Sequence, residues 1–275
     1  MIIDAHTHLF GPDPVRYPYA PDTYKPTTAG SAELLKSQMD EAGVDRAVTI
    51  SPWVYKWDVS YALDARAANR DWLAAAVLVD PWAPNAPRLL EHYVKDRHAC
   101  GLRIQGRISK LGAFDDPATT PLWAKAADLG LAVDVNATHA EYEQVEKRVQ
   151  QFPQTPFLLD HCGYISGDLA PQTPTVEPVL RMARYPNVYA KLTFLSLASR
   201  EAYPFADVHW MIREIVDAFG AERCLFGTNF PKAQYDPKLT YKQSVELFAQ
   251  VLDLSAAERG WILGGTAEKL WRWGD

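Results

Sequence analysis

Short apolar segments rich in Val, Ile, Leu and Ala recur eight times along this chain, and a longer amphipathic segment follows each of them. Apolar runs of this length are typical of parallel strands that are buried on both faces. Eight strand–helix units in series predict an α/β fold with one domain over residues 1–275, a slightly distorted (β/α)8 TIM-type barrel. The length fits, since such barrels typically have about 250 residues. The predicted strands are Ile2–Ala5, Ala47–Ile50, Ala74–Val79, Gly101–Gln105, Leu131–Val135, Phe157–Asp160, Val188–Leu192 and Cys224–Phe226.

The segments between these strands have the apolar spacing of surface helices. Residues Gly11–Gly30 are different: they contain five prolines and three tyrosines, and we expect a long loop over the active-site face of the barrel. The predicted helices are Ser31–Glu41, Val59–Arg70, Ala86–Arg97, Ala118–Leu129, Ala140–Gln151, Thr175–Arg184, Phe205–Phe219 and Lys242–Leu252, with extra C-terminal helices at Ser255–Leu263 and Thr266–Trp273.

Composition limits the partners of the chain. The net charge is −6 and there is no run of Lys and Arg, so neither nucleic acid nor a membrane is an expected partner. The three cysteines are far apart, which argues against a disulfide framework. The chain lacks a spanning apolar segment, and its N-terminus does not resemble a signal peptide. We therefore expect a cytoplasmic protein that acts on a small-molecule substrate, and these properties are compatible with a homo-oligomer.

The His6-Thr7-His8 sequence follows the first predicted strand. Residues two apart on a strand point to the same side, so both imidazoles are expected to face the barrel interior or its mouth. Two adjacent imidazoles can bind one metal ion or one substrate oxygen. The alternative is a pair of structural histidines. Asp4 has the same phase as His6, and it is expected either to orient a histidine or to be a structural carboxylate.

Other polar residues occur where later strands end. Any one of them alone is compatible with an ordinary charge at a strand end, but together they predict a polar ring at one end of the barrel. These residues are Arg103 and Arg107 at strand four, Asn136 and His139 at strand five, His161 at strand six, Lys191 at strand seven and Asn229 at strand eight.

Aromatic residues are frequent in the loops that follow the first three strands. They predict a flat or ring-containing substrate, and Arg103 and Lys191 predict an anionic group on it. The alternative for Trp53 and Trp57 is that they pack their loop onto the barrel. The predicted substrate-binding aromatics are Tyr19, Trp53, Tyr55, Trp57 and Trp82.

These motifs resemble those of the amidohydrolase superfamily, in the branch that includes pyrone-dicarboxylate lactonase and L-fuconolactonase. The resemblance implies a hydrolase that opens a lactone-like ester. It further implies that His6, His8 and His161 polarise the carbonyl, while Arg or Lys holds a substrate carboxylate. The matching segments are Ile3–His8, Gly101–Arg103, Leu159–Gly163, Val188–Leu192 and Phe226–Pro231.

Two positions depart from the pattern of the superfamily. Asn229 stands where an aspartate usually binds metal and takes a proton from water. Metal-binding members usually carry a histidine or lysine at the end of strand four or five, whereas strand five of this chain ends near Asn136. Two alternatives remain. In one, His6 and His8 bind a divalent ion, with zinc as the first candidate and His161 or His139 as a third ligand. In the other, no metal is bound, His161 acts as the base with an unperturbed pKa near 6.5, and Asn229 orients the water or donates to the oxyanion.

Two further functions compete with lactone hydrolysis. A metal-dependent decarboxylase of an aromatic or muconate-type acid shares the His-x-His motif and the barrel. A catalytically weakened barrel that only binds a ligand is compatible with Asn229.

Overall fold

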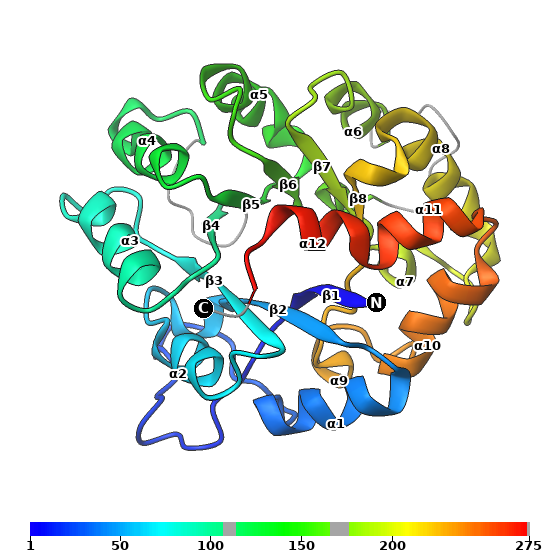
Figure 1. Ribbon diagram of the computed structural model, residues 1–275, viewed down its shortest axis with the longest axis horizontal. Helices are drawn as coiled ribbons and strands as arrows, with labels where there is room; N and C mark the ends of the chain where they lie inside the picture. Colours follow the sequence, from blue (N-terminus) through cyan, green and yellow to red (C-terminus); the bar gives the residue numbers. More distant parts are fainter. Residues whose placement is uncertain (107–113, 166–175, 274–275) are drawn as a thin grey trace.

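Eight parallel strands form a ring in the order of the sequence, from β1 to β8 (Figure 1). The computed structural model describes residues 1–106, 114–165 and 176–273. The predicted (β/α)8 barrel is confirmed. The strands are β1 (Ile3–Thr7), β2 (Arg46–Ile50), β3 (Leu73–Leu78), β4 (Gly101–Gln105), β5 (Ala132–Asn136), β6 (Phe157–Leu159), β7 (Val188–Lys191) and β8 (Cys224–Leu225).

The ring closes between β1 and the chain that follows β8. The backbone N–H of Ala5 donates to the carbonyl of Phe226 at 3.0 Å, and Thr7 forms a parallel bridge with Phe230. Because β8 has only two residues, this closure lies mostly beyond the end of the regular strand. The register between β1 and β2 also shifts between Asp4 and Thr7. These irregularities account for the distortion expected of the barrel.

Helices surround the strands, and their positions follow the amphipathic segments of the sequence (Figure 1). π-helical turns at Leu247–Val251 and Trp261–Gly265 extend α10 and α11. Two short helices, α7 (Leu195–Ala198) and α9 (Lys232–Tyr235), were not expected. The other helices are α1 (Ala32–Ala42), α2 (Ser60–Ala68), α3 (Ala86–Lys95), α4 (Thr120–Asp128), α5 (Tyr142–Gln151), α6 (Glu177–Met182), α8 (His209–Phe219), α10 (Tyr241–Glu246), α11 (Ala256–Gly260) and α12 (Thr266–Leu270).

Several predicted boundaries need correction. The first strand continues to Thr7, so His6 belongs to the strand and His8 follows it directly. The sixth strand ends at Leu159, because Asp160 begins a 3-10 turn. The predicted helix Phe205–Phe219 is regular only from His209, since Ala206–Val208 form a 3-10 turn.

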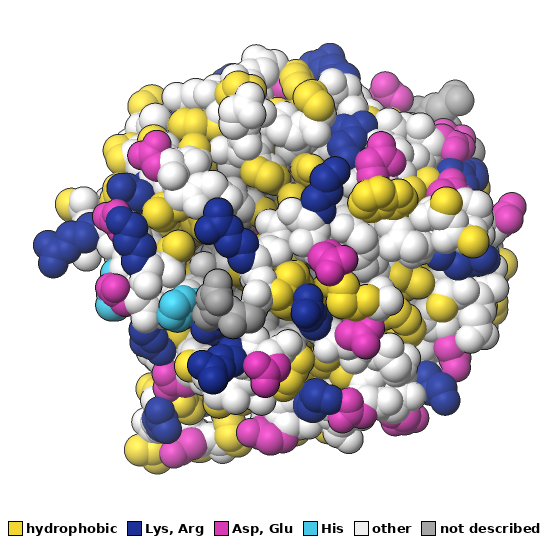
Figure 2. All heavy atoms as spheres, in the orientation of Figure 1, with side chains coloured by type: hydrophobic (Ala, Val, Ile, Leu, Met, Phe, Trp, Pro, Cys, Tyr) yellow, Lys and Arg dark blue, Asp and Glu magenta, His cyan; other side chains and the backbone are white. Residues whose placement is uncertain are grey.

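The C-terminal segment covers one end of the barrel. In Figure 1 α12 crosses the ring, and Trp271, which follows it, is buried among side chains from several strands, including Ile3, Val48 and Leu158. This end carries the first residues of the strands, so the opposite rim is left for the polar ring. On the face shown in Figure 2, positive and negative side chains are interspersed. Among the described residues, no helix is long and apolar enough to cross a membrane.

Candidate functional site

His6 of β1 and His8, which follows it, lie at the carboxyl-terminal rim of the barrel, and both are buried. The imidazoles of His6 and His8 meet edge to face with their ring centres 4.9 Å apart. Nδ1 of His8 lies 2.7 Å from the carbonyl oxygen of Ile50, the last residue of β2. Because a carbonyl only accepts, Nδ1 of His8 donates, and its Nε2 keeps a free lone pair. Within the described chain, that Nε2 makes no hydrogen bond.

His161 completes a cluster of three imidazoles. Its ring centre lies 4.8 Å from that of His6. Nδ1 of His161 lies 2.7 Å from the hydroxyl and 3.4 Å from the carbonyl oxygen of Thr193, which follows β7. Nε2 of His161 therefore also remains without a protein partner among the described residues. The rings of His8 and His161 are thus both held through Nδ1, which is how metal-binding histidines are usually oriented.

His161 reaches this position through an unusual turn. His161, Cys162, Gly163 and Tyr164 have φ values of 54°, 46°, 70° and 63°, so four successive residues are left-handed. This conformation costs roughly 1–2 kcal/mol for each residue that has a Cβ atom. Backbone strain of this kind is concentrated at functional sites, where surrounding contacts hold it in place. Here the turn brings His161 back toward β1 instead of continuing the direction of β6.

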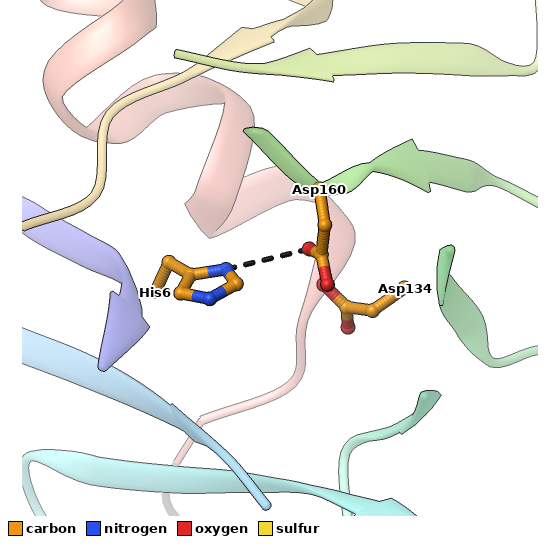
Figure 3. Close-up of side chains that lie close together, drawn as sticks. All are labelled: His6, Asp134 and Asp160. Atoms are coloured by element: carbon orange, nitrogen blue, oxygen red, sulfur yellow. Dashed lines mark ion pairs between the residues drawn. The ribbon is translucent and has the colours of Figure 1, made fainter. Parts of the chain in front are cut away.

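A buried charge cluster lies next to His6. Oδ1 of Asp160 is 3.3 Å from Nδ1 of His6 (Figure 3). Oδ2 of Asp160 is 2.9 Å from Nε of Arg103. The ammonium group of Lys191 contacts Asp134 and lies 3.5 Å from Asp160 and 3.2 Å from Nδ1 of His6. All five side chains are buried, so the charges compensate one another inside the barrel.

His6, Asp134 and Asp160 offer ligand atoms within 4.8 Å of one another, an arrangement that suits a metal ion (Figure 3). The ammonium of Lys191 lies among these three side chains, however, and it already supplies a positive charge to both carboxylates. A divalent ion would have to displace it. Nε2 of His6 is different, because it is buried and has no hydrogen-bond partner. Nε2 of His6 is therefore the ligand atom that is left free beside the carboxylate cluster.

The two carboxylates of the cluster respond differently to burial. Burial raises the pKa of Asp134, and the ammonium of Lys191 only partly opposes this effect. Burial would also raise the pKa of Asp160, but Arg103, Lys191 and His6 together hold it well below its usual range. Asp160 is therefore the permanent negative charge of the cluster.

The histidines are less basic than expected. Burial lowers the pKa of His161 to about 4, and Arg103 and Lys191 add to this effect while Asp160 opposes it. Burial and Arg103 lower the pKa of His8 to about 3. Both pKa values lie below the value near 6.5 of an imidazole in water. Both rings are neutral at pH 7, as ligands or proton acceptors must be.

The loop after β8 is fixed against β1. The N–H of Asn229 donates to the carbonyl of His6 at 2.8 Å, and Asn229 is left-handed with φ of 59°. Asp4 accepts from the N–H and hydroxyl of Thr228 and from the hydroxyl of Tyr241. Asp4 was expected in phase with His6, but the register shift in β1 directs its carboxylate to this loop and to α10. It contacts His6 only through the backbone N–H, at 3.2 Å.

Arg103 and Lys191, both expected to bind an anionic substrate, lie at different depths. Arg103 is 4% exposed, and its positive charge opposes the rise that burial causes in the pKa of Tyr235. Tyr235 packs on His8, so this end of Arg103 lies at the rim. Lys191 is 0% exposed and its ring contact is with Trp271 at the closed end. This differs from the expected contact with substrate, because carboxylates inside the barrel hold the ammonium.

The expected aromatic residues contact one another and neighbouring loops, and their role in substrate binding stays a prediction. Trp53 and Trp57 contact each other edge to face and pack against the hydrophobic core. The hydroxyl of Tyr55 accepts from the N–H of Gly11, and its ring lies 5.2 Å from that of Tyr19. Trp82 donates to Asp116.

Among the described residues, His139 makes no ring contact with the imidazole cluster. His139 begins a 3-10 turn after β5, and the described rings that pack against His161 are those of His6 and Tyr164. Arg107 lies outside the described residues.

Sequence reasoning missed several residues around the cluster. Tyr235 of α9 packs edge to face on His8 with ring centres 4.9 Å apart, and its hydroxyl contacts that of Tyr24. Tyr164 packs on His161 and donates to Asn136 at 2.7 Å. Strand alternation could have indicated Asp134 and Asp160. Asp134 in β5 and Asp160, which directly follows β6, are each spaced by two residues from a neighbour that points into the barrel. No comparable signal marked the tyrosines.

Comparisons with known proteins identify the family of this chain. The sequence profile of the family described as amidohydrolase matches residues 3–273. A 4-sulfomuconolactone hydrolase of Hydrogenophaga intermedia is 26% identical over 257 residues, which cover 93% of this chain and 82% of that protein. An L-fucono-1,5-lactonase of Burkholderia ambifaria is 26% identical over 203 residues, covering 72% and 68% of the two chains.

Solved structures share the fold. A Pseudomonas putida structure described as a 2-pyrone-4,6-dicarboxylic acid hydrolase has a TM-score of 0.85 at 19% identity and covers 98% of this chain and 96% of that one. A Burkholderia multivorans amidohydrolase with bound zinc has a TM-score of 0.78 at 20% identity, with 100% of both chains covered. The 5-carboxyvanillate decarboxylase of Sphingomonas paucimobilis has a TM-score of 0.68 at 16% identity and covers 99% of each chain.

Proposed function

The chain belongs to the amidohydrolase family, and we propose that it is a lactonase that hydrolyses a small, anionic, ring-containing substrate. The observation that carries this proposal is the cluster of three neutral imidazoles, His6, His8 and His161, in which Nε2 of His6 is buried and has no hydrogen-bond partner. Two similar proteins named above act on lactones, which supports a cyclic ester as the bond that is cleaved.

The positions of the residues suggest a division of labour. The imidazole cluster faces the lactone carbonyl. Arg103, which Asp160 holds at the rim, attracts an anionic group on the substrate. His161 is neutral at pH 7, so it can take the proton from the attacking water. Asn229 lies beside His6 and is proposed to orient that water or to donate to the developing oxyanion. Water adds to the carbonyl carbon, the ring C–O bond breaks, and the released oxygen takes up a proton, which gives a hydroxy acid.

A divalent ion is a second part of the proposal, and zinc is our first candidate for it. The Nε2 atoms of His6, His8 and His161 would hold it, since three imidazole ligands and an open position are typical of catalytic zinc sites. A bound ion would polarise the carbonyl and lower the pKa of a water molecule. The structure of a related protein with bound zinc supports this assignment.

Turnover of a panel of lactones tests the function. We would follow proton release with anionic lactones that carry a carboxylate or sulfonate and with neutral lactones of the same ring size. The proposal predicts hydrolysis of an anionic member and loss of most activity in His161→Gln. Near-normal turnover in His161→Gln would remove His161 from the chemistry. Carbon dioxide release from an aromatic acid, without lactone hydrolysis, would identify a decarboxylase instead, and binding without turnover would identify a ligand binder.

Metal content is tested separately by elemental measurement on the purified protein and by zinc titration after chelation. Asn229→Asp supplies the carboxylate that the superfamily usually has. We expect it to raise zinc affinity by about tenfold or more, which corresponds to about 1.4 kcal/mol. An unchanged affinity would argue against an ion bound near Asn229.

A further inference from the structure

Lys191 has three acceptors around its ammonium group. It contacts Oδ1 of Asp134, and it lies 3.2 Å from Nδ1 of His6 and 3.5 Å from Oδ1 of Asp160. An ammonium group has three hydrogens and no acceptor. Each hydrogen thus has one nearby acceptor, and no water is needed to satisfy the group inside the barrel.

This arrangement decides which nitrogen of His6 carries the proton. Because Lys191 can only donate, the nitrogen that faces it must accept, and a neutral imidazole then carries its hydrogen on the other nitrogen. Asp160 competes for the same Nδ1 at 3.3 Å. Oδ1 of Asp160 interacts with His6 electrostatically but has no well-aligned hydrogen bond with a described residue, so Lys191 makes the better-aligned contact with Nδ1.

We propose that Lys191 is a positioning residue that holds His6 as the Nε2–H tautomer. Nε2 of His6 is the buried nitrogen that has no partner in the protein. As a donor, it would bond to the substrate carbonyl oxygen and stabilise the oxyanion without any ion. This role in the reaction rests on the lactonase proposed above, whereas the tautomer itself does not depend on any substrate.

The same contact opposes metal binding at His6. A metal ion needs the lone pair of Nε2, so the hydrogen must move to Nδ1. There it would face the ammonium of Lys191, and only Asp160 would be available to accept it. Lys191 and Asp160 therefore favour opposite tautomers of one imidazole. His8 has no such restriction, since its Nδ1 already donates to Ile50.

The tautomer can be measured directly by nitrogen NMR on the metal-free full-length protein with 15N-labelled histidine. The signals of His6 are assigned by their loss in His6→Gln. We expect Nε2 to be protonated in the wild-type protein and the proton to move to Nδ1 when zinc is added. A wild-type His6 that is already protonated at Nδ1 without metal would overturn the proposal, and this measurement needs no variant of Lys191.

Lys191→Met then tests the cause. It should shift His6 to the Nδ1–H tautomer and raise zinc affinity by about tenfold or more, the size of effect typical of residues that orient metal ligands. Lys232→Met is a matched control, because Lys232 is also a buried lysine and pairs with Asp236 at 2.8 Å without contacting a histidine. An unchanged tautomer in Lys191→Met, or the same gain in zinc affinity in both variants, would remove Lys191 from this role. Neither readout uses turnover, so a failure here is distinct from a failure of the lactonase proposal.

Discussion

Arg103 and Asp160 form a buried ion pair: Nε of the guanidinium lies 2.9 Å from Oδ2 of the carboxylate, and the two side chains are 4% and 0% exposed. The pair joins β4 to the residue that directly precedes His161. A residue proposed to attract the substrate is therefore held by the same carboxylate that lies beside His6. Stability and substrate recognition are coupled at this point of the barrel.

Removing the charge of Asp160 should strongly destabilise the protein. In Asp160→Asn, Arg103 and Lys191 would stay buried with one counter-charge fewer, and breaking a buried pair in this way typically costs about 3–5 kcal/mol. Urea unfolding measures the loss. Asp64→Asn is the control, since Asp64 is 33% exposed and pairs with Arg16 and Arg97 near the surface. We expect a loss below about 1 kcal/mol there. Equal losses would mean that burial of the pair is not what matters.

Arg103→Lys should weaken recognition of anionic substrates more than turnover of neutral ones. A lysine ammonium lacks the planar fork that lets arginine bind Asp160 and still present donors to a second anion. A hydrogen bond to a charged group contributes about 1.5–3 kcal/mol, so KM for an anionic lactone should rise about 10–100-fold. Steady-state kinetics on matched anionic and neutral lactones make the comparison. A parallel rise in both KM values would point to a general disturbance of the site.

Acid should destabilise the folded protein through its buried histidines. His161 gains a proton at about pH 4 in the folded state and near pH 6.5 when unfolded. Between these values the unfolded chain binds more protons, so the free energy of unfolding falls as the pH is lowered from 6.5 to 4. The contribution of His161 is on the order of 3 kcal/mol, and His8 acts in the same direction.

Urea unfolding at a series of pH values measures this slope. His161→Gln should remove part of it. His92→Gln, at a side chain that is 51% exposed on α3, should leave it unchanged. An identical slope in wild type and His161→Gln would contradict the lowered pKa of His161.

Gly227→Ala should displace His6. A Cβ atom on Gly227 would lie 2.6 Å from Cβ of His6 and 2.8 Å from Cγ2 of Thr193, which is closer than real contacts allow. Overpacking of this kind typically costs about 1–3 kcal/mol. The loss of activity should exceed the loss expected from the smaller folded fraction, because His6 and Thr193, the hydrogen-bond partner of His161, would both be displaced. In Gly260→Ala the added methyl group meets no atom within 4 Å, so activity should be unchanged. Full activity in Gly227→Ala would show that the site tolerates this shift.

The barrel could be predicted because apolar runs and helical spacing are set by residues that are close together in the sequence. Eight such strand and helix patterns in series are enough to indicate the fold. The cap pair of α1 illustrates this: the hydroxyl of Ser31 accepts from the N–H of Leu34, and Gly43 adopts φ of 70°. His6, His8 and His161 were likewise found from strand ends alone, and the structure brings their rings together.

Other features depend on packing between distant parts of the chain. Lys191 was expected at the rim, but the carboxylates that hold it come from β5 and from the turn after β6, and no local pattern specifies that pairing. The left-handed turn at His161 contains three residues with a Cβ atom, and none of them signals that conformation. The lowered pKa of His161 depends on burial, which is a property of the completed fold.

The closure of the ring also has a consequence for how the protein is made. Thr228 holds Asp4 across 224 residues, and Lys191 reaches His6 across 185. The histidines at the start of the chain leave the ribosome long before the segments that fix them exist. Contacts of such long range are slow to form, because the intervening chain must be ordered first. Assembly of the imidazole cluster during synthesis would therefore mark the completion of the whole barrel, because the contacts that hold β1 need the chain that follows β8.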